Sequence, residues 1–493
     1  MLLFDNRMGV RVTTVLTRPQ SPTTEAPDLK RVLGPFSLVM LGIGSIIGAG
    51  IFVIAGTAAA EHAGPAVLVS FGIAGFGCLF AGLCYAEFAS MIPESGSSYT
   101  YAYATMGRFM AWFIGWNMVL EYGVSASTVA VGWSGYFVSL LQNFGIVFPA
   151  AFANAPLAAT GFHDMHATGA IINLPAVALV AALTVFLIVG VKESANFNGA
   201  MVLVKTAIVI LVILFGLPYV HLHNLTPFVP PNQGSFGKFG VSGILAASGM
   251  IFFAYIGFEA VSVAAQEARN PRRDLPIGIL GSLGICTVLY VLMAVVLLGV
   301  TNWRTLDVPN PVSFAMGHIR SLSWLIPLIN LGAVVGLASV VFVSLYGQSR
   351  VFYAMARDGF LGRMFSTVHP RFQTPWIGTI IIGIAAGLAA AVLPLDILAD
   401  LVSIGTLLAF VAVCAGIMIL RRTAPRARRP FRTPFVWFVA PAGIVICGIM
   451  MFSLSDATWV RLVLWTAIGV AIFFSYGIRH AAPSKWAVTN EDG

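Results

Sequence analysis

Charged residues are scarce in this chain: Asp, Glu, Lys and Arg make up only 9% of its 493 residues. A water-soluble domain needs about a quarter of its residues charged to cover its surface. Hydrophobic residues reach 58% and come in long blocks. About 20 apolar residues span the hydrocarbon core, and backbone polar groups inside lipid must be paired, so these blocks must be helices. The composition predicts an all-α membrane protein.

Cysteine and histidine are also few, with five and eight residues respectively. The cysteine spacings fit neither a zinc site nor a disulfide framework, and buried thiols usually behave as small apolar side chains. Because the histidines lie mostly in loops, the clustered His, Asp or Ser of a membrane-embedded enzyme is missing. Rings of charge and a carbonyl filter motif, which channels use, are missing too. We therefore expect no metal, no cofactor and no catalytic residue.

Charged or Pro/Gly-rich breaks divide the apolar sequence into twelve candidate transmembrane spans. The third and eighth are longer than one crossing, so we expect them to tilt or to continue beyond the bilayer. Residues 1–30 are polar and are expected to form a disordered cytoplasmic tail, followed by one transmembrane domain over 31–480 and a second tail over 481–493. The spans are 36–60, 65–91, 101–141, 171–191, 197–220, 240–267, 277–300, 324–356, 376–394, 397–420, 434–454 and 459–478.

The distribution of Lys and Arg predicts the orientation, because cytoplasmic loops carry an excess of these residues. With both termini inside, 22 of the 27 basic residues fall on the cytoplasmic side. The outer loops keep Lys238, Arg304, Arg320 and Arg461, and Lys205 lies within a span. The basic run over 421–432 joins two spans on the inner side, as this rule requires, so we expect no nucleic-acid partner.

Two spans contain glycines where a helix break is expected. The first has Gly42, Gly44, Gly48 and Gly50 within nine residues, which would weaken a continuous helix. Close helix packing of the small-xxx-small type is the alternative, but these glycines occupy more than one face. The sixth span, over 248–259, also has glycines and small residues in its middle. Paired interruptions at corresponding positions of two repeats point to a transport site near the middle of the membrane.

Three ionisable residues lie inside spans, where a charge is costly and usually faces a cavity or a partner. Lys205 lies well inside span five, Glu121 in the middle of span three, and Glu259 just after the expected break in span six. Snorkelling to the interface is the alternative for each, and it is weakest for the short side chain of Glu121. The lysine and the two acids can partly neutralise one another.

Together, the glycine run, the stretch 253–259 and Lys205 resemble the amino acid–polyamine–organocation (APC) transporters, above all the bacterial cationic amino acid transporter branch. Further family-like stretches are 85–96, 267–276 and 350–359, and the resemblance covers roughly residues 30–480. It implies a LeuT-type fold in which spans 1–5 and 6–10 form inverted repeats, over 36–220 and 240–420. Spans 1 and 6 would be broken, and two further helices would follow over 434–478.

The resemblance also implies roles for particular residues. Lys205 would stand where sodium-coupled relatives hold a cation, which points to proton coupling, and Glu121 would reach toward the far end of a long basic substrate. The sequence departs from the pattern at Ala49, often Thr or Ser in the family, and at Glu259, where an Asp is expected. The backbone around Ile46, Gly48, Ala49 and Gly50 would hold a substrate carboxylate, and Phe253, Ala254 and Ile256 would line the site and meet its ammonium group.

These expectations describe a proton-coupled amino acid symporter of the cytoplasmic membrane, with no enzymatic activity. Arginine, lysine or ornithine come first as substrates because of Glu121 and Glu259, and small neutral amino acids follow closely. An exchanger of amino acids or polyamines, and a nutrient sensor that binds without transporting, remain as alternatives. The expected partners are the amino acid and the lipid bilayer, and the sequence leaves a small accessory membrane subunit open.

Overall fold

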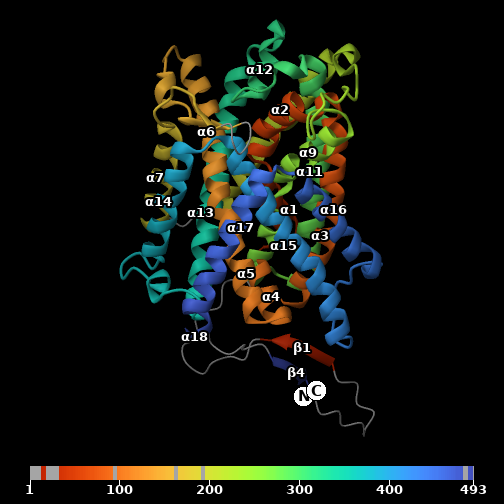
Figure 1. Cartoon of the computed structure of the whole chain (residues 1–493), viewed down its shortest axis with the longest axis vertical. Helices are drawn as coiled ribbons and strands as arrows, with labels where there is room; N and C mark the ends of the chain where they lie inside the picture. The colour runs from red at the N-terminus through yellow and green to blue at the C-terminus, as the bar shows by residue number, and fades with distance from the viewer. Residues whose placement is uncertain are drawn as a thin grey trace.

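The computed structural model describes residues 13–17, 33–92, 97–159, 165–189, 195–480 and 487–491. Its long helices run roughly parallel in one bundle (Figure 1). In this described part, nine helical stretches are long and apolar enough to cross a membrane, and Pro35–Ile46, Leu174–Val189 and Trp376–Val392 form shorter apolar helices. The chain is therefore a multi-pass helical membrane protein, as its composition predicts.

The α-helices differ widely in length, from single turns beside the breaks to the 33 residues of α13. They are α1 (Pro35–Ile46), α2 (Ala55–Ala58), α3 (Val67–Met91), α4 (Ser97–Met106), α5 (Arg108–Met118), α6 (Ser125–Asn143), α7 (Leu174–Val189), α8 (Ala195–Gly216), α9 (Gly240–Ile251), α10 (Ala260–Val263), α11 (Pro271–Val300), α12 (Pro311–Gly317), α13 (Leu325–Arg357), α14 (Trp376–Val392), α15 (Leu395–Thr423), α16 (Val436–Ser453), α17 (Asp456–Ile472) and α18 (Ile478–His480).

Short 3-10 and π-helical segments adjoin several of these helices or lie in the loops. The π-helical segments are η1 (Gly50–Ile54), η2 (Ala59–Ala63), η4 (Val119–Val124) and η13 (Phe473–Gly477). The 3-10 segments are η3 (Gly64–Ala66), η5 (Ala150–Phe152), η6 (Leu217–Tyr219), η7 (Leu222–Leu225), η8 (Phe252–Tyr255), η9 (Ala265–Glu267), η10 (Trp303–Thr305), η11 (Arg320–Leu322) and η12 (Arg363–Ser366).

The expected third span, 101–141, is divided in the structure. Gly107 has a φ of 85°, a value that favours glycine, and it separates α4 from α5. The apolar stretch is long because it includes α4, which lies at one end of the bundle (Figure 1). The remainder runs through α5, η4 and α6. The second helix accounts for only part of the unusual length, because the continuous stretch Arg108–Asn143 still has 36 residues and exceeds one crossing.

Two pairs of short strands lie in the connecting and terminal segments. β1 (Thr13–Thr17) pairs antiparallel with β4 (Ala487–Glu491), and β2 (Leu157–Ala159) with β3 (Met165–Ala167). The prediction of a disordered tail over 1–30 was wrong for the residues of β1. Their β-branched sequence favours strand structure once a partner strand is available. The other residues of 1–30 lie outside the described residues. β1 and β4 lie together at the end of the bundle that holds α4 (Figure 1).

The centre of the bundle is formed by α1 and its neighbours. α1 packs against α8 and α11 and also contacts α13. The surface is apolar: Val185 on α7, Leu388 on α14, Phe452 on α16 and Leu464 on α17 are all well exposed. Large exposed apolar areas are unusual for a soluble protein, and here they are the surface that faces lipid.

Candidate substrate-binding site

The first break interrupts the membrane helix that begins with α1. This helix ends at Ile46, the backbone of Ile47 is extended (φ −69°, ψ 98°), and η1 begins at Gly50. Residues 47 and 48 lie outside regular helix. A break of this kind leaves carbonyl groups on one side and N–H groups on the other without intrahelical partners. The interruption falls inside the glycine run where it was expected.

The second break follows α9. The chain tightens into η8, becomes extended at Ile256 (φ −62°, ψ 137°) and returns to helix at Ala260. Gly257 between them has a φ of 123°, which is readily accessible only to glycine. A Cβ atom at Gly257 would lie 2.6 Å from the carbonyl oxygen of Ser45. Glycine is therefore required here both for its backbone angle and for close approach to α1.

The two breaks touch one another. A Cβ atom on Gly50 would lie only 2.2 Å from Cα of Ala254 and 2.4 Å from its Cβ. Gly50 thus lets η1 and η8 meet with their backbones almost in contact, and Gly257 lets the second break approach the end of α1 just as closely. Residues about 200 positions apart in the sequence form one site because of these two glycines.

A cavity of about 40 Å³ lies at this crossing. A single buried water needs roughly 10–15 Å³, so the cavity has room for about three waters. Pockets for small molecules usually measure roughly 300–1,000 Å³, so the site is too narrow for an amino acid in this conformation. Its lining consists of Ser45, Ile46, Gly48, Ala49, Gly50, Glu121, Tyr122, Ser125, Val129, Phe253, Ile256, Gly257, Glu259, Ala260, Val340, Val343 and Ser344.

Two buried carboxyl groups face this cavity. Glu121, in the π-helical segment η4, is 1% exposed, and neither of its carboxyl oxygens has a hydrogen-bond partner among the described residues. Glu259 is fully buried; its Oε2 accepts from the N–H of Gly257 at 2.9 Å, while its Oε1 has no partner in the same part of the chain. The two carboxyl groups interact electrostatically with each other and lie close enough to share one proton in a hydrogen bond between them. Unpartnered buried acceptors of this kind require a proton or a bound cation.

Lys205 lies beside the first break rather than in the cavity. Its side chain is fully buried on α8, and Nζ donates to the carbonyl oxygen of Gly44 and, at 3.4 Å, to Oγ of Ser339 on α13. No carboxylate of the described residues lies within ion-pair distance of this ammonium group. The last carbonyl of α1, on Ile46, accepts at 2.8 Å from the Tyr290 hydroxyl. Polar side chains of other helices therefore bind carbonyls near the broken end of α1.

Most of the residues expected at the site lie together at the cavity. Ala254 does not line it and instead packs against Gly50. The roles of these residues in binding remain predictions. Sequence reasoning missed Ser125, although it follows Glu121 by four residues and so lies on the same helix face. It also missed Ser45 within the glycine run, and the α13 residues Val340, Val343 and Ser344, which no sequence signal marks.

Comparison with known proteins gives a consistent picture. The chain is 44% identical over 460 residues to the branched-chain amino acid permease BcaP of Bacillus subtilis, covering 93% of this chain and 96% of the relative. It is 42% identical over 465 residues to the methylthioribose transporter of the same organism, covering 94% and 97%. It is 37% identical over 399 residues to the vacuolar cationic amino acid transporter 4 of Arabidopsis thaliana, covering 81% and 64%.

A family profile described as amino acid permease matches residues 33–485, which is most of the chain. The family and these relatives are transporters and not enzymes. Together with the two broken helices that meet at a small cavity, this match shows that the chain belongs to the amino acid permease family of APC transporters.

Proposed function

We propose that this protein is a secondary active permease that carries amino acids into the cell together with protons. The observation that carries the proposal is the narrow cavity where the two breaks meet, with Glu121 and Glu259 facing it. An amino acid offers a carboxylate and an ammonium group, and a pair of broken helices offers free N–H and C=O groups for both.

The main chain at the breaks would recognise the part common to all amino acids. The N–H groups of Gly48, Ala49 and Gly50, where the helix resumes after the first break, suit the carboxylate, since helix N-termini attract anions. Carbonyl groups near Phe253 and Ile256 suit the ammonium group. This arrangement requires no charged side chain for the zwitterion, so Glu121 and Glu259 remain available for the substrate side chain or for a proton.

The unpartnered carboxyl groups favour a cationic side chain, as in arginine, lysine or ornithine. A branched-chain neutral side chain is the second candidate, because Val129, Val340 and Val343 give much of the cavity an apolar lining and BcaP is a branched-chain permease. With a neutral substrate, Glu121 and Glu259 would share protons. The balance between these candidates depends on whether Glu121 binds the substrate directly.

The narrow cavity fits transport by alternating access. At about 40 Å³ the site must widen before it admits an amino acid, and the extended residues at each break are natural hinges. Lys205 is our candidate for proton coupling. Loss of its proton would weaken its bond to the carbonyl of Gly44, two residues before the end of α1, and would free this helix to move.

We also propose twelve crossings arranged as two inverted repeats of five, over 36–220 and 240–420, followed by α16 and α17. The continuous stretch Gly50–Met91 has 42 residues, about 63 Å of helix for a core of about 30 Å, and Gly64 interrupts it with a φ of 59°. The residues of this stretch before Gly64 complete crossing one, which begins with α1, and the residues after Gly64 form crossing two. With the other eight long stretches and the two shorter helices α7 and α14, the total is twelve crossings. β1 and β4 at the same end agree with an even number (Figure 1). The excess of arginine at this end of the bundle favours its placement on the cytoplasmic side, with the protein embedded in the cytoplasmic membrane.

The proposal is tested with purified full-length protein. Thermal stabilisation by each of the twenty amino acids and by methylthioribose identifies ligands, because a ligand that binds only the folded state raises the melting temperature. Proteoliposomes then measure uptake of the best ligand with an inward proton gradient. Uptake that depends on a preloaded amino acid would indicate an exchanger, and stabilisation without any flux would indicate a sensor.

Lys205→Ala tests the coupling role. We expect this variant to lose pH-driven uptake almost completely while it still binds substrate, because the proton-dependent bond to Gly44 is gone. Its melting temperature with and without ligand checks that it folds. Uptake in K205A that still follows the pH gradient would exclude Lys205 from coupling.

A further inference from the structure

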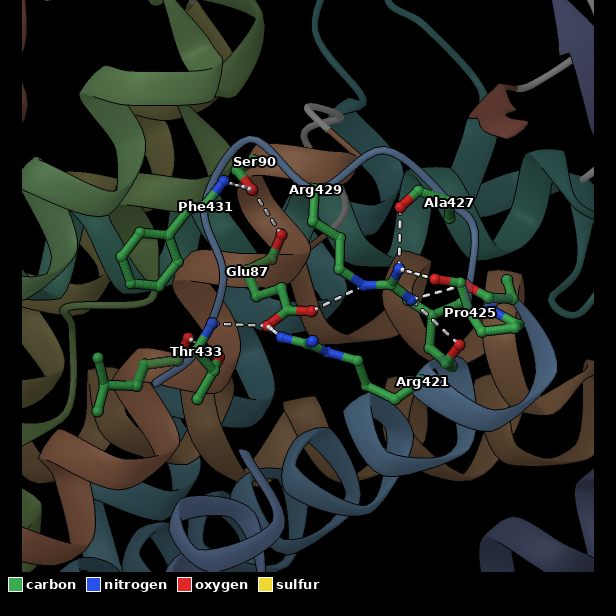
Figure 2. Close-up of polar contacts among 11 residues, drawn as sticks. Glu87, Ser90, Arg421, Pro425, Ala427, Arg429, Phe431 and Thr433 are labelled. Atoms are coloured by element: carbon green, nitrogen blue, oxygen red, sulfur yellow. Dashed lines mark hydrogen bonds and ion pairs between the residues drawn. The ribbon is translucent and has the colours of Figure 1, made fainter. Parts of the chain in front are cut away.

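The loop between α15 and α16 is strongly basic and has a defined conformation. Together with the last turn of α15 it carries six arginines over 421–432, of which Arg421 and Arg422 belong to α15, and no acidic residue follows up to the start of α16 at Val436. In Figure 2 the loop passes over Glu87, a residue of α3, and two of the arginines point toward its carboxylate. The six are Arg421, Arg422, Arg426, Arg428, Arg429 and Arg432.

Glu87 fastens the loop to the bundle. It is fully buried, and its Oε2 accepts from Arg421 at 2.7 Å and from the main-chain N–H of Thr433 at 2.8 Å. Its Oε1 accepts from Nε of Arg429 at 3.1 Å (Figure 2). A buried charge is tolerated when it is paired and fully hydrogen-bonded, and Glu87 meets this condition.

Arg429 holds the loop in a compact turn. It is 7% exposed, and its NH1 and NH2 groups donate to four carbonyl oxygens of the loop and of the last turns of α15 (Figure 2). A cation at this position also suits the negative end of the α15 dipole. The side chains of Arg421 and Arg429 therefore bind groups within the protein and are not offered to an external ligand. The four acceptors are Leu420, Ala424, Pro425 and Ala427.

The other four arginines of this segment, one in the last turn of α15 at position 422 and three in the loop at 426, 428 and 432, are exposed. Beside them, three aromatic side chains at the start of α16 are also exposed: Phe435 at 86%, Trp437 at 53% and Phe438 at 67%. The guanidinium of Arg422 lies 5.2 Å from the ring centroid of Trp437 and joins the two groups. Phe435 has a φ of 43°, an unfavourable value for a bulky residue that persists only where the surrounding structure imposes it.

We propose that this surface, formed by the four exposed arginines and by Phe435, Trp437 and Phe438, binds the headgroups of anionic phospholipids in the adjacent leaflet. Basic clusters next to a membrane helix attract anionic lipid, and exposed aromatic residues occupy the interface between headgroups and acyl chains. A soluble anion would need only the arginines. The adjoining aromatic residues match a ligand that has both a phosphate and an acyl chain.

The division of the arginines supports a binding surface rather than a simple charge excess. The positive-inside rule requires only that basic residues be on one side. It does not require that the buried carboxylate of Glu87 bind the loop, that Arg429 cap the end of α15, or that Phe435 adopt an unfavourable φ. These features together keep four exposed arginines beside three exposed aromatic rings. Ordering the loop in advance lowers the conformational cost of binding.

The test uses full-length protein in non-ionic detergent, titrated with phosphatidylglycerol or with zwitterionic phosphatidylcholine, and bound lipids are counted by native mass spectrometry. We expect R426Q/R428Q/R432Q to lose affinity for phosphatidylglycerol by roughly fivefold for each arginine removed, with no change for phosphatidylcholine. The matched control R363Q/R371Q/R479Q removes the same charge from exposed positions outside the loop and should bind like the wild type.

Three results would overturn the proposal: unchanged phosphatidylglycerol binding in R426Q/R428Q/R432Q, an equal loss in the matched control, or displacement of the lipid by inorganic phosphate, which would assign the surface to a soluble anion. If the triple variant has a lower melting temperature than the wild type in lipid-free detergent, the single variants R426Q, R428Q and R432Q are each titrated with phosphatidylglycerol instead. A loss of about fivefold in each supports the proposal, and wild-type affinity in all three contradicts it.

Discussion

At the scale of single residues, Glu121 is the most informative side chain of the site. It is buried, it faces the cavity, and its carboxyl oxygens have no donor among the described residues. A group in this position is costly unless something pairs with it. Glu87, by contrast, is equally buried but has every oxygen bonded. The difference separates a carboxylate that stabilises the fold from one that is available to a ligand.

We predict that Glu121→Gln weakens binding of a cationic amino acid much more than binding of alanine. A hydrogen bond to a charged group contributes about 1.5–3 kcal/mol, so the Kd for arginine or lysine should rise by about tenfold or more. Isothermal titration with both ligands measures the difference. Asp456→Asn, an exposed acid at the start of α17, is the control and should leave both Kd values unchanged. An equal loss for both ligands would exclude Glu121 from side-chain recognition.

At the scale of elements, the essential feature is the contact between the two broken helices. Gly50 and Ala254 leave no room for a methyl group between their backbones. The segments at the breaks must therefore move together, and the cavity between them changes shape whenever either one shifts. This explains why the glycines of the first span are more than a packing device.

Gly50→Ala should push the breaks apart. Overpacking typically costs about 1–3 kcal/mol, so we expect a lower melting temperature and at least a tenfold loss of uptake in proteoliposomes. Gly72→Ala is the matched control: a Cβ at this position in α3 meets no atom within 4 Å, and alanine favours helix over glycine by about 0.5–1 kcal/mol. G72A should transport normally and melt slightly later. Normal uptake by G50A would show that the close approach is dispensable.

The sequence predicts these elements unevenly. Apolar length predicts the long helices, and the glycine runs predict where two of them break. Contacts between residues about 200 positions apart, such as Gly50 with Ala254 and Gly257 with Ser45, cannot be predicted from any local sequence pattern. The division at Gly107 and the α13 side of the cavity were missed for the same reason, since a backbone angle and a packing partner depend on the folded surroundings.

At the scale of the whole molecule, the proposed arrangement makes a directional prediction. Ser235 is exposed in the loop before α9 and Thr423 is exposed at the end of α15, with five proposed crossings between them. A membrane-impermeant maleimide should label S235C in intact cells and T423C only after permeabilisation. The five native cysteines are buried, so they should contribute little signal. Labelling of both from one side would contradict the crossing count, and the reverse pattern would invert the orientation.

The bonds to Glu87 also set an order of events during synthesis. Arg421 follows Glu87 by 334 residues, so at about 5–20 residues per second its partner leaves the ribosome roughly 17–67 s later. Until then α3 carries an acid whose charge has no compensation, and deep burial of that end of α3 is unfavourable. The end of α3 that carries Glu87 should therefore stay near water until α15 and its loop arrive. Closing this end of the bundle becomes one of the last steps in the maturation of the nascent chain.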